Sequence, residues 1–473
     1  MIARSLALAP ALVFAVASPA HAIHGGYGSA SPSYGWRAIA GPVEIPMAED
    51  TTNLQLMSRT PEFATDNINQ IKVVFPNFYI ASSARPDSGA KAQPGNSAIV
   101  TASIEYPAGT CTQLKFSGSA SGTISNGGQS TSDALTISIP NGATFWVREY
   151  TTTATGATVV GSTAAADLSH FDSADGEAVM GWASGGTDYT GSCAASSSWS
   201  GGTSITNTAR KPIAVVGWTQ HSAVCLIGDS RTRGYGDLAS SPYTPSNHFG
   251  QFDRWIGSSF GTINLGANGD RGKETSQNDG HFTNRGALLQ YCTHAIYAYG
   301  INDFNNIPYN SAAVEEGYFQ VFQSLYDSTH SLFWYIATAY PYATLCPGSL
   351  LFSDSSGSGG YTPSQKESAR QAYNSDVRNV AISGQDGVID IDAVVAESPW
   401  PGWTGGAFGS YASCYATTTD TGLSKNLSSD NLHLLSPGTY WVANAFMNAP
   451  GTFTGIRKPK ALFCTDKTGA YRC

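Results

Sequence analysis

The chain has 473 residues, which exceeds the usual size of one domain, so two domains are expected. Only 12% of the residues are charged and the formal net charge is -9, which excludes the basic stripe that nucleic-acid-binding proteins use. We therefore expect no nucleic-acid partner. A surface with few charges and many polar uncharged residues suits an extracellular protein near neutral polymers.

Residues 1–22 have the pattern of a signal peptide. Arg4 supplies a positive charge, the run from Leu6 to Ala17 is apolar, and Ala20-His21-Ala22 forms a cleavage site before Ile23. The apolar run is too short to span a bilayer, which favours cleavage over anchoring. No other segment is long and apolar enough to cross a membrane. We expect a secreted or periplasmic protein.

Eight cysteines in an exported chain predict disulfide bonds. Sequential pairing within each region favours Cys111–Cys193, Cys346–Cys414 and Cys464–Cys473, and the last pair would close a C-terminal tail over residues 456–473. Cys225 and Cys292 are given no partner. Cys225 lies in the middle of an apolar run, which is typical of a buried thiol.

Residues 23–211 are expected to form an all-β domain. Short runs rich in β-branched and aromatic residues recur between glycine, serine, asparagine and proline. The runs are Gln70–Ile80, Ser97–Tyr106, Thr112–Gly118, Ala134–Pro140, Thr144–Tyr150 and Glu177–Ala183. Their spacing predicts a β-sandwich or jelly roll. The segment from Gly185 to Asn207 is rich in glycine and serine and fits a loop or part of the interdomain link.

Residues 212–455 alternate between strand and helix patterns, which predicts an α/β domain with a parallel sheet. The expected strands are Ala223–Ile227, Thr262–Gly266, Thr293–Gly300, Ser331–Tyr340 and Gly387–Val395. Helices are expected after Ser230, over residues 248–260, 285–290, 312–329 and 363–382, and near Pro437.

The turn Gly228-Asp229-Ser230 joins the first of these strands to a helix. Open α/β sheets place their ligands at the carboxyl ends of strands, and a helix N-terminus favours developing negative charge. Ser230 is therefore a candidate nucleophile. The alternative is that Asp229 or Ser230 only caps the helix.

Three further segments follow predicted strands or lie in the loops after them. They are Gly269-Asp270, Gly300-Ile301-Asn302-Asp303 and Asp430-Asn431-Leu432-His433. Ester hydrolysis needs a base for the serine hydroxyl, a carboxylate that orients the base, and donors for the tetrahedral oxyanion. These segments supply a histidine, an aspartate, a glycine N–H and an asparagine amide.

The order and identity of the four segments resemble the SGNH, or GDSL, hydrolase family over about residues 223 to 449. The resemblance implies a flavodoxin-like three-layer fold and a serine esterase. In that family Ser230 would be the nucleophile, His433 the general base and then acid, and Asp430 the group that orients the imidazole.

The resemblance also implies an oxyanion hole. Its donors would be the backbone N–H groups of Ser230 and Gly269 and the side chain of Asn302, with Gly266 as the alternative to Gly269. We expect no cofactor. We also expect no metal, because His248, His281 and His294 lack the spacing of metal ligands.

Three motifs compete with this assignment. Asp167-Leu168-Ser169-His170 lies in the β region, and Asp327-Ser328-Thr329-His330 ends a helix on the opposite edge of the sheet. The segment from Gly257 to Gly261 matches a Gly-x-Ser-x-Gly elbow, but that elbow requires a strand before the serine and a helix after it. Here the predicted order is reversed, and we assign none of the three to catalysis.

The substrate is less closely defined than the reaction. The chain resembles carbohydrate esterases in two features, the β domain ahead of the catalytic domain and the Gly228–Gly236 segment. This resemblance favours O-acetyl groups on a polysaccharide as the substrate. Trp400 and Trp403 could stack on a sugar or only fix their loop, and Arg231 could contact substrate or be a solvated residue. The alternatives are a lipid or aryl esterase, and a silent polysaccharide-binding protein.

Overall fold

The computed structural model describes residues 33–41, 44–80, 86–161, 170–206, 210–237, 248–272, 280–304, 332–340, 363–379, 385, 387–392, 433, 436, 439, 440, 442 and 443. The expected signal peptide (1–22) and C-terminal tail (456–473) lie outside these residues. The chain divides into units of residues 1–33 and 34–473, and every element below belongs to the second. Within the described ranges, no helix is long and apolar enough to cross a membrane.

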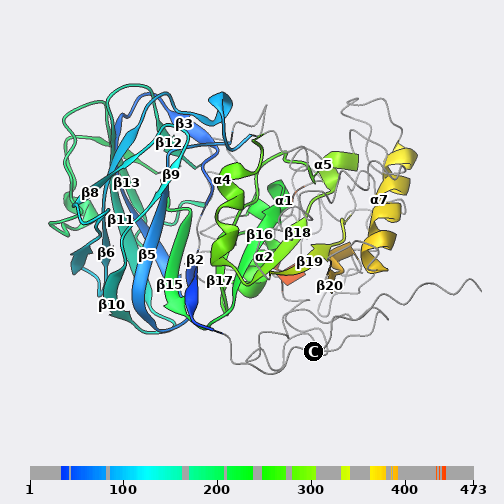
Figure 1. Cartoon of the computed structure of the whole chain (residues 1–473). Coiled ribbons are helices and arrows are strands. Elements are labelled where there is room, and N and C mark those ends of the chain that lie inside the picture. The colour runs from blue at the N-terminus through cyan, green and yellow to red at the C-terminus, as the bar shows by residue number, and fades with distance from the viewer. Residues whose placement is uncertain are drawn as a thin grey trace, which may run out of the picture. The chain divides into compact units, whose positions relative to one another are not determined.

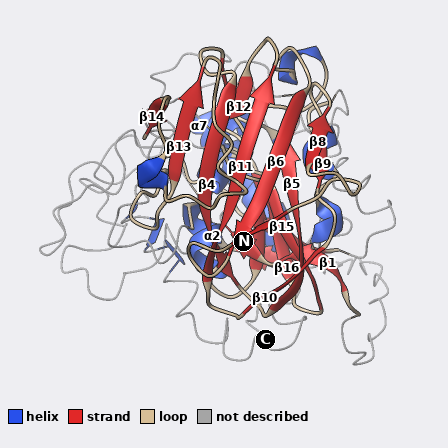
Figure 2. Ribbon diagram, turned by 90° about the vertical axis from the view of Figure 1, so that its left-hand side faces the viewer, coloured by secondary structure: helices blue, strands red, loops and turns tan. Residues whose placement is uncertain are grey.

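A large antiparallel sheet dominates the N-terminal half (Figure 2). Its long strand β11 pairs with β4 on one side and β6 on the other. Alternate side chains such as Phe145 and Val147 enter the core, as the period of a strand requires. The sheet comprises β2 (Ala40–Gly41), β4 (Gln55–Ala64), β6 (Ala98–Glu105), β7 (Cys111–Gln113), β8 (Ser121–Ile124), β11 (Thr144–Thr153), β13 (Ala178–Trp182) and β14 (Thr203–Ile205).

A second antiparallel sheet shares this core. Val73 of the second sheet and Ile104 of the first are fully buried in one hydrophobic cluster, as in a β-sandwich. The predicted strand runs coincide with β5, β6, β7, β10, β11 and β13. The second sheet comprises β1 (Gly35–Ala38), β5 (Ile68–Pro76), β9 (Gln129–Thr131), β10 (Leu135–Ile139) and β15 (Ala214–Thr219).

Smaller elements accompany the two antiparallel sheets. Strands β3 (Ala48–Asp50) and β12 (Thr158–Val160) form a separate antiparallel pair. Two short 3-10 turns, η1 (Ala90–Ala92) and η3 (Ser196–Ser198), lie in the loops. The second turn falls in the segment from Gly185 to Asn207, which is expected to be a loop or part of the interdomain link. Strand β14 lies in the same segment and corrects that expectation, because it pairs with β13 in the large sheet.

Strand β15 extends the antiparallel pairing past the boundary expected between residues 211 and 212. It pairs with β5, with Ala214 opposite Val74 and Val215 opposite Val73. Its apolar sequence fits a buried strand of either kind of sheet, so the pattern alone did not assign it.

The predicted parallel sheet is confirmed in the C-terminal half (Figure 1). The strand order is β17-β16-β18-β19-β20, and each neighbouring pair is parallel. This order matches the flavodoxin-like arrangement, in which ligands bind beyond the carboxyl ends of the strands. The strands are β16 (Ala223–Gly228), β17 (Gly261–Asn264), β18 (His294–Ala298), β19 (Phe333–Ala337) and β20 (Gly387–Ile389).

The helices of this half are mostly short. In place of the helix expected over 285–290, the structure has two brief turns, α4 (Thr283–Gly286) and the 3-10 turn η4 (Leu289–Tyr291). The described residues between 436 and 443 are helical, whereas the helix expected over 312–329 lies outside the described residues. The described helices are α1 (Ser230–Arg233), α2 (Gly250–Ile256), α4 (Thr283–Gly286), α5 (Ile301–Phe304) and α7 (Pro363–Arg378).

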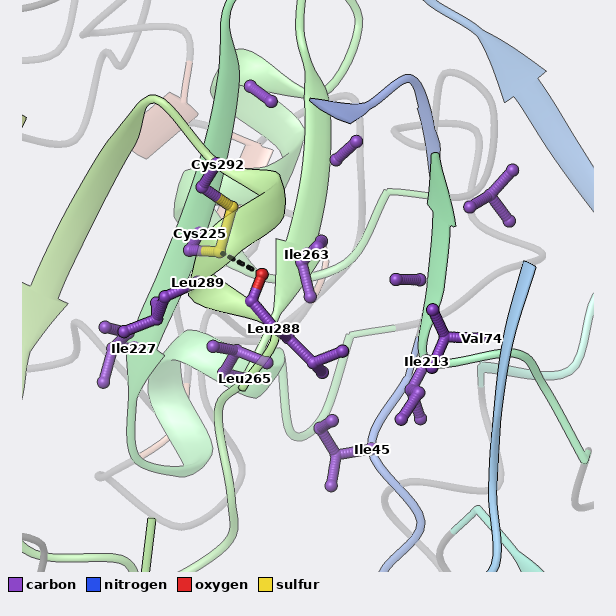
Figure 3. Close-up of a cluster of buried hydrophobic side chains, with 14 of the residues drawn as sticks. Ile45, Val74, Ile213, Cys225, Ile227, Ile263, Leu265, Leu288, Leu289 and Cys292 are labelled. Atoms are coloured by element: carbon purple, nitrogen blue, oxygen red, sulfur yellow. Dashed lines mark hydrogen bonds between the residues drawn. A yellow bond between two sulfur atoms is a disulfide. The ribbon is translucent and has the colours of Figure 1, made fainter. Parts of the chain in front are cut away.

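The expected division into two separate domains is not confirmed. The antiparallel and parallel sheets fall in one unit, and one hydrophobic cluster contains Val74 and Ile213 together with Ile263 and Leu288 (Figure 3). A Cβ atom at Gly261 in β17 would collide with the backbone of residues 38 and 39. The edge of the parallel sheet is therefore packed directly on the antiparallel region.

Two disulfides lie in the described residues. Cys111–Cys193 is the predicted pair. Cys225 is not a buried thiol but is bonded to Cys292, because β18, which follows Cys292, is the neighbour of β16 in the sheet (Figure 3). The predicted pairs Cys346–Cys414 and Cys464–Cys473 lie outside the described residues.

Candidate active site

The turn between β16 and α1 places Ser230 at the carboxyl edge of the parallel sheet. Asp229 has an extended backbone, and its carboxylate accepts a hydrogen bond from the Arg231 N–H at 2.9 Å. Asp229 is therefore the residue that caps α1, and the Ser230 hydroxyl is left for another partner. The structure thus separates the two roles that the sequence left open.

Gly228 lets this turn pack closely against the neighbouring strand. A Cβ atom at residue 228 would collide with the Thr232 hydroxyl and would lie 2.7 Å from the Ala298 carbonyl oxygen. Any larger residue would displace the start of α1, so the glycine fixes the position of Ser230.

Ser230 contacts a histidine from the C-terminal part of the chain. Its Oγ atom lies 2.7 Å from Nε2 of His433. The imidazole also packs against the ring of Tyr235, with 4.4 Å between centroids and a tilt of 47°. The Oγ–Nε2 distance is the one that a nucleophile and its general base require. Asp430, the expected orienting carboxylate, lies outside the described residues.

Two of the three segments expected to form the oxyanion hole are joined by hydrogen bonds. The Asn302 side chain, in α5, donates to the Asp270 carbonyl oxygen at 3.0 Å, and the Gly272 N–H donates to Asp303 Oδ2 at 3.1 Å. These two bonds join the loop after β17 to the turn after β18. Gly269, in the same loop, has a φ of 71°, which favours glycine.

Gly266 is the less suitable oxyanion donor of the two glycines. Its N–H already donates to Asn264 Oδ1 at 3.0 Å, and a Cβ atom at residue 266 would lie 2.6 Å from the Arg233 nitrogen. Both observations give Gly266 a packing role against α1. They favour Gly269 as the donor.

Asp229 is a carboxyl group near His433 within the described residues. Burial raises the pKa of Asp229 from its ordinary value of 3.8 to about 6, and nearby Asp270 adds to the rise. The positive charge of Arg231, the hydrogen bond from its N–H and the imidazole of His433 oppose it. Above this pKa, Asp229 carries negative charge close to the imidazole.

The two arginines of α1 are not solvated. Arg231 donates from Nη1 to the Tyr340 carbonyl oxygen at 2.7 Å, and its guanidinium lies 3.8 Å from the Tyr340 ring centroid. Arg233 donates to the Ile45 carbonyl oxygen at 2.8 Å and pairs with Glu44. Both side chains are buried, which corrects the interpretation of Arg231 as a solvated residue. A substrate contact by Arg231 stays a prediction.

The Trp400 and Trp403 side chains, expected to stack on a sugar or to fix their loop, lie outside the described residues. The Asp-x-x-His motif that ends at His330 also lies outside them. In the Gly257–Gly261 segment, helix α2 precedes and strand β17 follows, as the sequence predicted. That order does not form a nucleophile elbow.

His170 contacts the C-terminal end of α1, the helix that begins at Ser230. Its Nε2 lies 3.0 Å from the Gly234 carbonyl oxygen, and its Nδ1 lies 3.3 Å from a carboxylate oxygen of Glu44. Its ring stacks on Phe249 with centroids 4.0 Å apart. The sequence predicts no role for His170, and the structure adds its contact with the end of α1. No spacing pattern in the sequence indicates it.

A possible metal-ligand cluster appears among the described residues. Glu105, Cys111 and Cys193 bring their ligand atoms close together, but the two cysteines form a disulfide and offer no thiolate. His248 and His294, which lack the sequence spacing of metal ligands, are both buried. His294 also stacks on Phe333.

Asp270 is a site residue whose role the sequence analysis did not assign. Its carboxylate is fully buried and accepts hydrogen bonds from Arg285 Nη1 at 2.6 Å and from the Tyr299 hydroxyl at 2.8 Å. Its carbonyl oxygen holds Asn302. The charge network around Asp270 therefore reaches the group expected to bind the oxyanion.

No family model and no curated protein matches the chain. Among solved structures, a carbohydrate acetylesterase from Sinorhizobium meliloti is 14% identical, with 47% of this chain and 95% of that one covered and a TM-score of 0.30. A peptidoglycan O-acetylesterase is 10% identical, with 91% and 79% covered and a TM-score of 0.35.

An aryl esterase from M. smegmatis is 13% identical, with 47% of this chain and 95% of that one covered and a TM-score of 0.28. Likeness of this degree assigns neither the fold nor the activity of the chain. The functional interpretation therefore depends on the residues of the chain itself and on their geometry.

Proposed function

We propose that the chain is a secreted serine esterase that removes O-acetyl groups from a polysaccharide. The observation that carries the esterase proposal is the 2.7 Å contact between Ser230 Oγ and His433 Nε2 at the carboxyl edge of a parallel sheet. A serine hydroxyl is a weak nucleophile without such a base. A silent binding protein would not need this contact.

In the proposed reaction, Ser230 Oγ attacks the ester carbonyl carbon while His433 Nε2 accepts the hydroxyl proton. The carbonyl oxygen becomes an oxyanion that the N–H groups of Ser230 and Gly269 and the Asn302 amide stabilise. Collapse breaks the bond to the alcohol oxygen, which takes the proton from His433, and leaves an acyl-serine.

Water then releases the acyl group. His433 takes a proton from the water as the water oxygen attacks the acyl carbon. The second tetrahedral intermediate then collapses by breaking its bond to Ser230 Oγ, which takes the proton back from His433, and the carboxylic acid is released. In this scheme Asp430 orients the imidazole and stabilises its positive charge. The scheme needs no cofactor.

The polysaccharide part of the proposal is supported by features of the sequence. The signal-peptide pattern directs the chain to a compartment where polysaccharides occur, and the low charge content suits contact with neutral polymers. The antiparallel region is packed on the catalytic half within one unit, so it could contribute to a substrate surface.

A substrate panel tests the proposal. The mature protein is assayed for acetate release from an acetylated polysaccharide and for hydrolysis of medium-chain aryl esters. A serine-reactive fluorophosphonate should label Ser230 and inactivate the enzyme, whereas the exposed Ser259 serves as the control for non-specific labelling. Ser230→Ala should lower turnover by on the order of 10⁶.

Each outcome has a clear reading. Acetate release supports the polysaccharide proposal, and turnover of aryl esters alone would replace it with a small-molecule esterase. Labelling of Ser259, or activity of Ser230→Ala above about one per cent of wild type, would contradict the nucleophile assignment.

A further inference from the structure

Arg285 of α4 is a buried arginine that joins two carboxylates. Its Nη1 donates to Asp270 Oδ2 at 2.6 Å, and its Nε lies 3.3 Å from Asp87 Oδ2. The side chains of all three residues are 0% exposed. Charges withdrawn from water to this extent are tolerated only when they are paired, so the geometry of the group is tightly fixed.

Asp87 belongs to the antiparallel region and holds the start of α4. One carboxylate oxygen accepts the N–H groups of Thr283 and Asn284 at 2.8 and 3.1 Å, and the other accepts the Arg285 N–H at 2.8 Å. Burial raises the pKa of Asp87, and the charge of Arg285 and these hydrogen bonds oppose the rise. Asp87 therefore fixes both the backbone and the side chain of Arg285.

Asp270 stands at the other end of the group. Its carboxylate is held by Arg285 and by the Tyr299 hydroxyl at 2.8 Å. Its carbonyl oxygen accepts the Asn302 side chain at 3.0 Å, and its nitrogen belongs to the peptide bond with Gly269. The position of Asp270 thus affects the positions of both Gly269 and Asn302, the two expected oxyanion donors outside α1.

The charges of the group also suit an oxyanion site. Asp270 alone would place a negative charge near a developing negative charge, which would oppose catalysis. Burial alone would lower the pKa of Arg285, but Asp270, Tyr299 and Asp87 raise it, so the guanidinium stays positive. Arg285 therefore neutralises Asp270 beside the site.

We infer that Asp87, Arg285 and Asp270 are positioning residues that hold the Gly269 and Asn302 donors in place for the oxyanion. This inference rests on the proposed esterase function. None of the three needs to touch the substrate. A residue of the antiparallel region, Asp87, would then set the turnover of the catalytic half, because donors must be preorganised before charge develops.

Three mild substitutions test the inference. Arg285→Lys keeps the positive charge but loses the planar fork, Asp87→Asn keeps an acceptor oxygen, and Tyr299→Phe removes one hydrogen bond. Each should lower kcat by roughly 10-fold to 100-fold, as a small misplacement of catalytic groups does. KM should stay within about twofold, because the oxyanion forms only in the transition state.

The same substitutions are then made in an Asn302→Ala background. If the network acts mainly through Asn302, each substitution should change kcat there by less than about threefold. Arg210→Lys is the matched control, because Arg210 pairs with Glu149 at 2.6 Å and both side chains are only 1% exposed. It should lower the melting temperature without a selective loss of kcat.

The outcomes are distinct. Loss of stability with unchanged kcat in all three variants would overturn the inference. Equal losses of kcat with and without Asn302 would overturn it for the Asn302 donor and would leave Gly269 as the donor that the network holds. If Asp87→Asn or Arg285→Lys does not fold, Tyr299→Phe decides, since it removes a single oxygen atom. A wild-type protein with no ester turnover and no fluorophosphonate labelling of Ser230 would overturn the proposed function itself, and this inference with it.

Discussion

The Nε2 atom of His433 lies 2.7 Å from the Oγ atom of Ser230, although 203 positions separate the two residues in the sequence. The short helix α1 presents the serine directly after the buried strand β16, and Tyr235 packs against the imidazole from the end of that turn. The turn that carries the proposed nucleophile therefore holds the proposed base by a hydrogen bond and by ring packing.

His433→Ala should abolish turnover, with a fall in kcat on the order of 10⁶, because Ser230 then has no base. His170→Ala is the matched control. His170 contacts Gly234 and not Ser230, so its removal should lower the free energy of unfolding by roughly 1–3 kcal/mol while most of kcat remains. Kinetics and denaturant unfolding of both variants check this, and a folded but inactive His170→Ala with an active His433→Ala would reverse the assignment.

Asn302→Ala should lower kcat by roughly 10²–10³ with little change in KM, because the amide acts on charge that develops in the transition state. The lost contact with the Asp270 carbonyl oxygen should also loosen the loop after β17. Steady-state kinetics distinguish a role of the Asn302 amide in the transition state from a role in binding the substrate. A rise in KM at unchanged kcat would show that Asn302 binds the substrate in its ground state.

Much of the fold could be predicted from period and spacing, and the exceptions have physical reasons. Strand β4 is not among the runs expected from the sequence, and Pro61 interrupts its pattern, since proline is rare inside a sheet. On the side of β4 away from β11, β13 pairs with residues 55–59 and β2 with residues 63 and 64. Pro61 lies between the two pairings, where no ladder donor is needed.

The site could be predicted only where its residues form local motifs. The glycine, serine and asparagine blocks lie at strand ends, which the strand pattern reveals. Asp87 and Arg285 are 198 positions apart, and no local pattern joins them. The burial of Arg231 under Tyr340 likewise depends on a neighbour 109 positions away.

The Cys225–Cys292 disulfide gives a further prediction. Replacing both cysteines with alanine should lower the free energy of unfolding by roughly 2–4 kcal/mol, because a loop of 67 positions is no longer closed in the unfolded chain. Denaturant unfolding of the variant measures the loss. Mild reductant should open Cys111–Cys193 first, since those cysteines are partly exposed whereas Cys225 is 0% exposed. Equal stability of the variant and the wild type would contradict the prediction.

Asp229→Asn tests the buried charge beside the base. The pKa of Asp229 is raised to about 6 in the folded chain from an ordinary value of 3.8. Between about pH 4 and pH 6 the folded state therefore holds a proton that the unfolded state has released, and the free energy of unfolding falls as pH rises. A shift of about two units corresponds to roughly 3 kcal/mol.

Asparagine keeps an acceptor for the Arg231 N–H and carries no charge, so the variant lacks this pH dependence. Its gain in unfolding free energy over the wild type should grow from near zero at about pH 4 to roughly 3 kcal/mol at about pH 8. Its kcat should fall at neutral pH, because the lost carboxylate no longer stabilises a positive imidazole at His433. Denaturant unfolding across this range, with kinetics at neutral pH, measures both effects. A stability difference that does not vary with pH would show that Asp229 does not titrate in this window.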